Sequence, residues 1–263
     1  MKKLLVGILL LIGVGVLATL LWRAPDRPVH AQLEAGTPVD LSGFLRAEGP
    51  VPLHFPEDHG PHPAYQTEWW YYTGNLDTMD GRHFGYQLTF FRRALKAKTG
   101  ERASDWATNQ VYMAHFTITD VAGENFYAHE RLERGAVGLA GAESMPFSVW
   151  LEDWRVSAIG QDQYQLSASV PLDDGTGQLA IDLTLVDVRG PVLQGDQGYS
   201  RKGPDPGQAS YYYSLTHLKS QGTLTLGSQQ FSVSGLSWMD HEYSTSASPP
   251  TRSAGTGLPC RLT

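Results

Sequence analysis

The feature that most limits the fold of this chain is a series of short segments in which apolar and polar residues alternate. In residues 83–93 (HFGYQLTFFRR), Phe84, Tyr86, Leu88 and Phe90 fall on one face of an extended strand. The preceding segment, 68–76 (EWWYYTGNL), is followed by an Asp-Gly turn in 79–82 (MDGR), which favours a β-hairpin. No long segment after residue 35 has the period of a helix.

The same pattern continues through the rest of the chain. Turns are predicted at 173–177 (DDGTG) and 226–228 (LGS), and further strands at 110–120, 125–131, 147–159, 163–170, 178–187, 209–219, 221–227 and 230–238. About ten antiparallel strands joined by turns favour a closed barrel or a sandwich. Aromatic residues on both strand faces predict an apolar inner lining, as in barrels that hold a ligand. We therefore predict an all-β fold.

The N-terminus differs from the rest of the chain. Lys2 and Lys3 precede an uncharged apolar stretch, Leu4 to Trp22, which is typical of an export signal or a membrane anchor. The small-residue pattern Val29-His30-Ala31 would permit cleavage, so removal of 1–31 and retention as an anchor both stay open. Either outcome predicts an exported protein, periplasmic or attached to the membrane and facing the periplasm. Residues 32–62, rich in proline, are predicted to be a linker.

The net charge limits the partners that the chain can bind, and the cysteine content limits how it can be stabilised. The whole chain carries −7, and without residues 1–31 it keeps 16 basic and 26 acidic residues, a net charge of −10. An acidic domain repels nucleic acid, so no nucleic-acid partner is expected. The single cysteine, Cys260, leaves no internal disulfide. With 41% hydrophobic residues the chain can bury a core, and stability must come from packing.

The densest chemistry lies in SWMDHEYS. In a strand, Trp238, Asp240 and Glu242 share one face, while His241 and Tyr243 share the other with Met239. Two carboxylates beside an indole raise each other's pKa, and burial raises it further, so one of them could act as a general acid near neutral pH. A cluster of ion pairs and turns at a domain junction is the alternative interpretation.

Strand parity also divides EWWYY. Trp69 and Tyr71 point one way, and Glu68, Trp70 and Tyr72 the other, which is consistent with core packing on both sides. A buried Glu68 would need a partner. His115 lies on a strand face between Met113 and Thr117 and fits either a core histidine or a polar group of a pocket.

Two other patterns are weaker evidence for a functional site. The loop 54–63 (HFPEDHGPHP) collects three histidines and two acids, a donor set that zinc can use, but its prolines and glycine do not supply rigid ligand positions. No metal and no other cofactor is therefore expected. The segment GLSWM at 235–239 lacks the last glycine of a nucleophile elbow, and no helix is predicted after it.

Five segments together resemble one family. They are EWWYYTGNL, AHFTITD (114–120), QGYSRKG (197–203), YYYSLTHLKSQGTL (211–224) and SWMDHEYSTS (237–246). The chain resembles the carotenoid 1,2-hydratase family, also called hydroxyneurosporene synthase or AttH-like proteins, many of which are described as predicted secreted hydrolases. The resemblance implies two lipocalin-like antiparallel β-barrels, the first over 63–236 and the start of a second, incomplete one over 237–247.

The resemblance also implies a reaction. Carotenoid 1,2-hydratases add water to a terminal carbon–carbon double bond of an acyclic carotene without a cofactor. By resemblance Asp240 is the general acid, with Trp238, His241 and Tyr243 beside it. The residues expected to bind an isoprenoid or lipid are Trp69, Trp70, Tyr72, His115 and Tyr212. A non-catalytic lipid carrier and a secreted hydrolase are the alternative functions.

The C-terminal tail departs from the family pattern, whose members run longer. Codons such as GGG ACT GGC TTG CCC TGC CGG CTG AC encode Gly255 to Thr263, and the neighbouring frame reads Trp-Asp-Trp-Leu-Ala-Leu-Pro-Ala-Asp. That reading looks like the aromatic strand that follows the motif in the family. We therefore expect a frameshift near Ser248, which would make 248–263 an aberrant tail.

Overall fold

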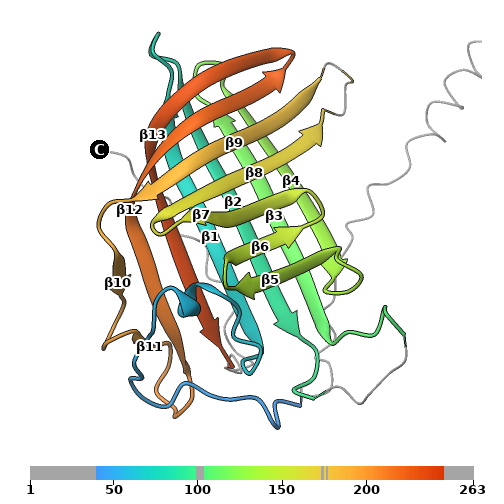
Figure 1. Ribbon diagram of the computed structural model, residues 1–263, viewed down its shortest axis with the longest axis vertical. Coiled ribbons are helices and arrows are strands. Elements are labelled where there is room, and N and C mark those ends of the chain that lie inside the picture. Colours follow the sequence, from blue (N-terminus) through green and yellow to red (C-terminus); the bar gives the residue numbers. More distant parts are fainter. Residues whose placement is uncertain (1–39, 99–103, 173–174, 176, 246–263) are drawn as a thin grey trace, which may run out of the picture. The chain divides into compact units, whose positions relative to one another are not determined.

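The computed structural model describes residues 40–98, 104–172, 175 and 177–245 (Figure 1). The predicted signal or anchor (1–31) and the predicted aberrant tail (248–263) lie outside these residues, and so does Cys260. In the described part of the chain, no helix is long and apolar enough to cross a membrane.

Most of the described residues lie in strands. The one short helix is a 3-10 turn, η1 (Glu57–His59). The strands are β1 (Thr67–Asp77), β2 (His83–Ala94), β3 (Gln110–Asp120), β4 (Asn125–Arg134), β5 (Ala140–Ser144), β6 (Phe147–Leu151), β7 (Trp154–Gly160), β8 (Gln163–Pro171), β9 (Gln178–Asp187), β10 (Pro191–Leu193), β11 (Tyr199–Arg201), β12 (Ala209–Gly227) and β13 (Gln229–Ser244).

All pairings between these strands are antiparallel. The order in the sheet is β4-β3-β2-β1-β13-β12-β9-β8-β7-β6-β5, and the short strands β10 and β11 both pair with β12. β4 also contacts β6, so the sheet curls back on itself into a nearly closed barrel. The predicted all-β, lipocalin-like barrel is confirmed.

The strand bounds follow the predicted alternation closely, with a few differences. The predicted strand 147–159 is divided into β6 and β7 by a turn in which Glu152 has a positive φ of 55°. The two segments predicted at 209–219 and 221–227 are one long strand, β12. The short strands β5, β10 and β11 lie in segments where no strand was predicted, because three to five residues show too little alternation to detect.

β13 is the strand that closes the two halves of the sheet together. It lies between β1 and β12 (Figure 1). Along β1, Thr67 is paired with Ser244 and Asp77 with Ser234. Residues 237–244, predicted to begin a second barrel, are thus part of the first one. The second, incomplete barrel is not confirmed.

The inner lining of the barrel is apolar, as predicted, and its large side chains pack against one another. In β2, every second side chain from Phe84 to Phe90 is buried, in the same alternation that the sequence shows. Fully buried members from other strands include Trp70, Phe116, Leu151, Trp154 and Tyr213.

Residues 40–66, most of which were predicted to be a linker, pack against the barrel and are called here the N-terminal strap. The backbone N–H of Leu45 donates to the carbonyl of Ala64 at 2.9 Å, which folds the strap back on itself. The indole N–H of Trp70 donates to the carbonyl of His59 at 2.9 Å, and the Phe55 ring contacts the Tyr213 ring edge-on. These contacts attach the strap to the barrel.

Candidate functional site

The predicted site residues lie on two opposite faces of the same strands. Strand parity in SWMDHEYS and EWWYY is as predicted, since Met239 and His241 are fully buried inside the barrel whereas the indole of Trp238 is 38% exposed outside. On the outer face are Trp69, His115, Tyr212, Trp238 and Asp240, and on the inner face are Trp70, Tyr72, His241 and Tyr243.

Asp240 is a partly buried carboxylate on the outer face of β13, paired with Ser214 of β12. Its Oδ1 accepts hydrogen bonds from the Tyr212 hydroxyl at 2.9 Å, the Ser214 hydroxyl at 2.5 Å and the Trp238 indole N–H at 2.7 Å. Within the described residues, Oδ2 has no hydrogen-bond partner. We call Asp240 with these three donors the Asp240 patch.

The second carboxylate of the motif has its own partner. Glu242 lies on the same face as Asp240, as predicted, and pairs with the Lys202 ammonium at 2.8 Å. That ammonium also lies 5.1 Å from the centre of the Tyr212 ring. Burial, with Asp240 beside it, raises the pKa of Tyr212 to about 12, so the phenol keeps its proton and remains a donor at neutral pH.

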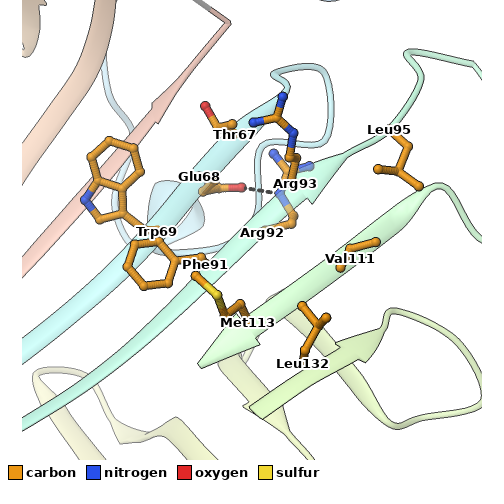
Figure 2. Close-up of a pocket in the computed structure, with 10 residues that line it drawn as sticks. All are labelled: Thr67, Glu68, Trp69, Phe91, Arg92, Arg93, Leu95, Val111, Met113 and Leu132. Atoms are coloured by element: carbon orange, nitrogen blue, oxygen red, sulfur yellow. Dashed lines mark hydrogen bonds and ion pairs between the residues drawn. The ribbon is translucent and has the colours of Figure 1, made fainter. Parts of the chain in front are cut away.

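An apolar groove lies next to the Asp240 patch on the outer face. The strand register places Trp69, Phe91, Met113 and Leu132 in one row across β1 to β4, and Trp69 is paired with Glu242 of β13. Leu95 and Val111 complete its apolar lining, and the groove measures about 470 Å³ (Figure 2). We call it the outer groove.

His115 lies in the row that contains Asp240. The register runs from Asp240 through Tyr71 and Thr89 to His115, with Glu130 beyond. The imidazole Nε2 of His115 is 2.9 Å from Glu130, and its ring meets Phe91 edge-on. His115 is therefore an outer-face group beside the groove and not a core histidine.

On the inner face, Glu68 is the centre of a buried polar network. Its carboxylate is 2.8 Å from Nε2 of His241, 2.8 Å from Nδ1 of His62 and 2.8 Å from Nε of Arg92. Burial disfavours the charged carboxylate, but these donors outweigh it and hold the pKa of Glu68 well below its usual range. The backbone N–H of His62 also donates to this carboxylate. Glu68, for which a partner was expected if it is buried, thus has four donors.

The network extends into the N-terminal strap through His62. Its Nε2 is 3.1 Å from Asp58, so the imidazole lies between two carboxylates, and these raise its pKa against the effect of burial. Asp58, His62, Glu68, Arg92 and His241 form what we call the buried network. The sequence signalled the loop acids and histidines as a cluster but gave no sign of Arg92.

The buried network includes a set of atoms that suits a metal. The ligand atoms of His62, Glu68 and His241 lie within 4.8 Å of one another, and two histidines with a carboxylate form a donor set that zinc uses. Each of these atoms already has a hydrogen-bond partner, and the Arg92 guanidinium supplies the positive charge beside Glu68. The geometry therefore accounts for the cluster as an ion-pair network.

The remaining inner-face residues pack around this network. The Trp70 indole stacks on His241, and the Tyr243 ring stacks on His62 at 3.6 Å between centroids. The Tyr72 hydroxyl is buried, and no described residue forms a hydrogen bond with it. Trp70, Tyr72, His241 and Tyr243 are therefore sealed from the outer groove by the sheet itself.

The fold defines the class of protein as a lipocalin-like antiparallel barrel, and comparison with known proteins gives the family. The model of the AttH-like family matches residues 46–255, so the chain belongs to the AttH-like family. A search of curated proteins gives no match.

Two solved structures resemble the chain. A crystal structure of a protein assigned as AttH from Nitrosomonas europaea is 32% identical, with a TM-score of 0.67, and the match covers 79% of this chain and 60% of that one. Kievitone hydratase from Nectria haematococca is 10% identical, with a TM-score of 0.50 and coverage of 78% and 58%, and so supports the fold alone. This chain spans about 60% of the length of these proteins.

Proposed function

We propose that the protein binds an elongated apolar molecule, of the isoprenoid or lipid class, on the outer face of β1 to β4, β12 and β13. We further propose that Asp240 adds water across a terminal carbon–carbon double bond of that molecule. The observation that carries the proposal is the position of the Asp240 carboxylate, partly buried among aromatic groups and on the same face as the outer groove.

The groove suits an apolar chain. Its walls are Trp69, Phe91, Met113 and Leu132 with Leu95, so a hydrocarbon lying across β1 to β4 would remove these side chains from water. Along β1, Tyr71 follows Trp69 on the same face and is paired with Asp240. The end of a chain held in the groove would then reach the Asp240 carboxyl.

The reaction needs three steps that the patch can perform. The first step needs Asp240 in its protonated form, whose Oδ2 proton passes to the terminal alkene carbon and leaves a tertiary carbocation. The electron-rich faces of Trp238 and Tyr71 stabilise that cation. Water adds its oxygen to the cation and returns a proton to the Asp240 carboxylate, so the net change is the addition of one water.

The donors around Oδ1 assign different tasks to the two carboxyl oxygens. Tyr212, Ser214 and Trp238 hold Oδ1 in one position, whereas Oδ2 is left to carry and deliver the proton. A fixed carboxyl group keeps the reacting geometry without reorganisation.

We also propose that the protein works outside the cytoplasm, because the apolar stretch from Leu4 to Trp22 follows two lysines. Fractionation of cells that express the full chain tests this. Recovery in the cytosol with residues 1–31 intact would contradict it.

The reaction is tested with an acyclic carotene in water enriched in oxygen-18. The wild-type chain should yield a product that has gained one labelled water, and Asp240→Asn should yield none while retaining carotene binding. The matched control is Asp182→Asn, which changes a carboxylate on β9 that accepts a hydrogen bond from Gln165. This variant should keep the turnover of the wild type. Turnover by Asp240→Asn would overturn the role of Asp240, and binding without product in the wild type would favour the lipid carrier. Hydrolysis of an ester substrate would favour the hydrolase.

A further inference from the structure

A second pocket is separate from the outer groove and shares no lining residue with it. It measures about 300 Å³ and lies between the N-terminal strap, the β5–β6 turn and the strands β7 and β8. Phe55, Pro56, Phe147 and Ala158 supply apolar walls, and the buried His59 and Tyr164 reach its lining. We call it the His59 pocket.

The polar end of the His59 pocket is connected to the buried network by hydrogen bonds. Nδ1 of His241 is 3.1 Å from the Tyr213 hydroxyl, and that hydroxyl is 2.7 Å from Nδ1 of His59. Nε2 of His59 is in turn 3.3 Å from the Tyr164 hydroxyl. An unbroken chain of side chains thus joins Glu68 to the wall of the pocket.

The carboxylate at the inner end sets the direction of every bond in this chain. Ionised Glu68 can only accept, so Nε2 of His241 carries the proton and its Nδ1 accepts from Tyr213. The Tyr213 oxygen then accepts from Nδ1 of His59. Nε2 of His59 is therefore an acceptor, and the Tyr164 hydroxyl donates to it. The assignment requires both imidazoles to be neutral, and burial does lower the pKa of His241 and lowers that of His59 to about 4.

The direction of the chain determines what the pocket can bind. Because the proton of Tyr164 is directed at His59, the phenol oxygen can offer only lone pairs to a ligand, so the ligand must be the donor. Asp162 and Asp187 also line the pocket, and their negative charge disfavours an anion. The walls favour an apolar body, and the volume is at the lower end of the range for ligand sites.

We propose that the His59 pocket is a second binding site, which takes a small uncharged molecule with a hydroxyl group on an apolar body. The hydroxyl donates to the oxygen of Tyr164, and the body packs against Phe55 and Phe147. This site does not depend on the reaction proposed for Asp240.

Three probes with one common body test the proposal by calorimetric titration at pH 7. They are 4-ethylphenol, ethylbenzene and 4-ethylbenzoate. One hydrogen bond corresponds to a roughly five-fold change in affinity, so 4-ethylphenol should bind at least about five-fold more tightly than ethylbenzene. The anion 4-ethylbenzoate should bind more weakly than both. Equal affinities for 4-ethylphenol and ethylbenzene, or preferred binding of 4-ethylbenzoate, would overturn the proposal.

Variants locate the binding. Tyr164→Phe should remove the preference for 4-ethylphenol and leave the affinity for ethylbenzene unchanged. The control Tyr127→Phe on β4 should change neither affinity. Ala158→Trp should fill the pocket and abolish binding. Asp162→Asn removes a negative charge from the lining and should raise the affinity for 4-ethylbenzoate, which tests the site even if Ala158→Trp does not fold. Asp240→Asn should bind 4-ethylphenol normally, which separates this site from the proposed reaction. Unchanged selectivity in Tyr164→Phe would place the probe elsewhere and refute the inference.

Discussion

Each face of β1 and β13 carries a carboxylate near aromatic rings, but the two carboxylates differ in burial and in the number of their hydrogen-bond donors. On the inner face, Glu68 has four donors and is sealed by packed aromatic rings. On the outer face, Asp240 has three donors on one oxygen, and the indole of Trp238 beside it is 38% exposed. A fully paired buried carboxylate stabilises a fold, whereas a partly paired one at the surface can exchange a proton with a ligand. Strand alternation separates the two roles, because Asp240 and the buried-network residue His241 are consecutive in β13 and lie on opposite faces.

The largest effect should come from breaking the inner-face ion pair. Glu68→Ala leaves the Arg92 guanidinium, 1% exposed, without its carboxylate, and we expect this to cost about 3–5 kcal/mol of unfolding free energy. Urea denaturation measures the change. Asp240→Asn keeps an acceptor at Oδ1 and should cost less than about 1 kcal/mol. Similar losses in the two variants would contradict the distinction between the faces.

The adjacent tryptophans give a matched pair. Trp70→Ala removes a fully buried indole, which is stacked on His241, and should destabilise the protein by about 3–5 kcal/mol. Trp69→Ala shortens a wall of the outer groove and should cost about 1 kcal/mol or less, with a larger loss of carotene affinity. Thermal unfolding and a carotene titration measure the two effects. A large stability loss in Trp69→Ala alone would reverse the assignment of the faces.

The inner face should also make stability depend on pH. The pKa of His59 falls from 6.5 in the unfolded chain to about 4 in the fold because the ring is buried, so the unfolded state takes up the proton first. Stability should therefore fall by at most about 3 kcal/mol as the pH drops from 6.5 to 4, and His241 acts in the same direction. His59→Gln should flatten the profile in this window. The same slope in His59→Gln and wild type would exclude His59 as its cause.

The smallest effect should come from the outer-face ion pair. Lys202 is 41% exposed and its partner Glu242 is 8% exposed, so water screens only one end of the pair, and Lys202→Ala should cost about 1 kcal/mol. Its contribution should fall further in high salt. A loss comparable to that in Glu68→Ala, unaffected by salt, would show that the outer face is structural as well.

Local residue patterns predicted much of the fold. The alternation in 83–93 and in SWMDHEYS predicted both the strands and the face of each side chain, because the period of a strand is a local property. The pairing of Thr67 with Ser244 was not predictable, since the two lie 177 residues apart and local pattern does not specify which strands meet. The assignment of 237–247 to a second barrel is not confirmed, because the sequence did not show that 237–244 pair with β1 and β12.

The candidate site was predictable only in part. The sequence indicated Asp240 as a candidate and predicted that a buried Glu68 would need a partner. It did not indicate that Arg92 is that partner, because their contact depends on the pairing of β1 with β2. The loop at 54–63 was predicted to be irregular because of its prolines and glycine. Its attachment through His59 and His62 depends on tertiary contacts that no local rule describes.

The most direct test of the account is to determine which face of the barrel holds the apolar ligand. An isoprenoid with a terminal diazirine and no hydroxyl group would be photolysed on the protein, and the labelled residues identified by mass spectrometry of peptides. We predict labels at Trp69, Phe91 and Met113 in the outer groove and at Trp238 next to Asp240. Labels confined to the inner face or to the His59 pocket would contradict the claim that the outer face is the functional one.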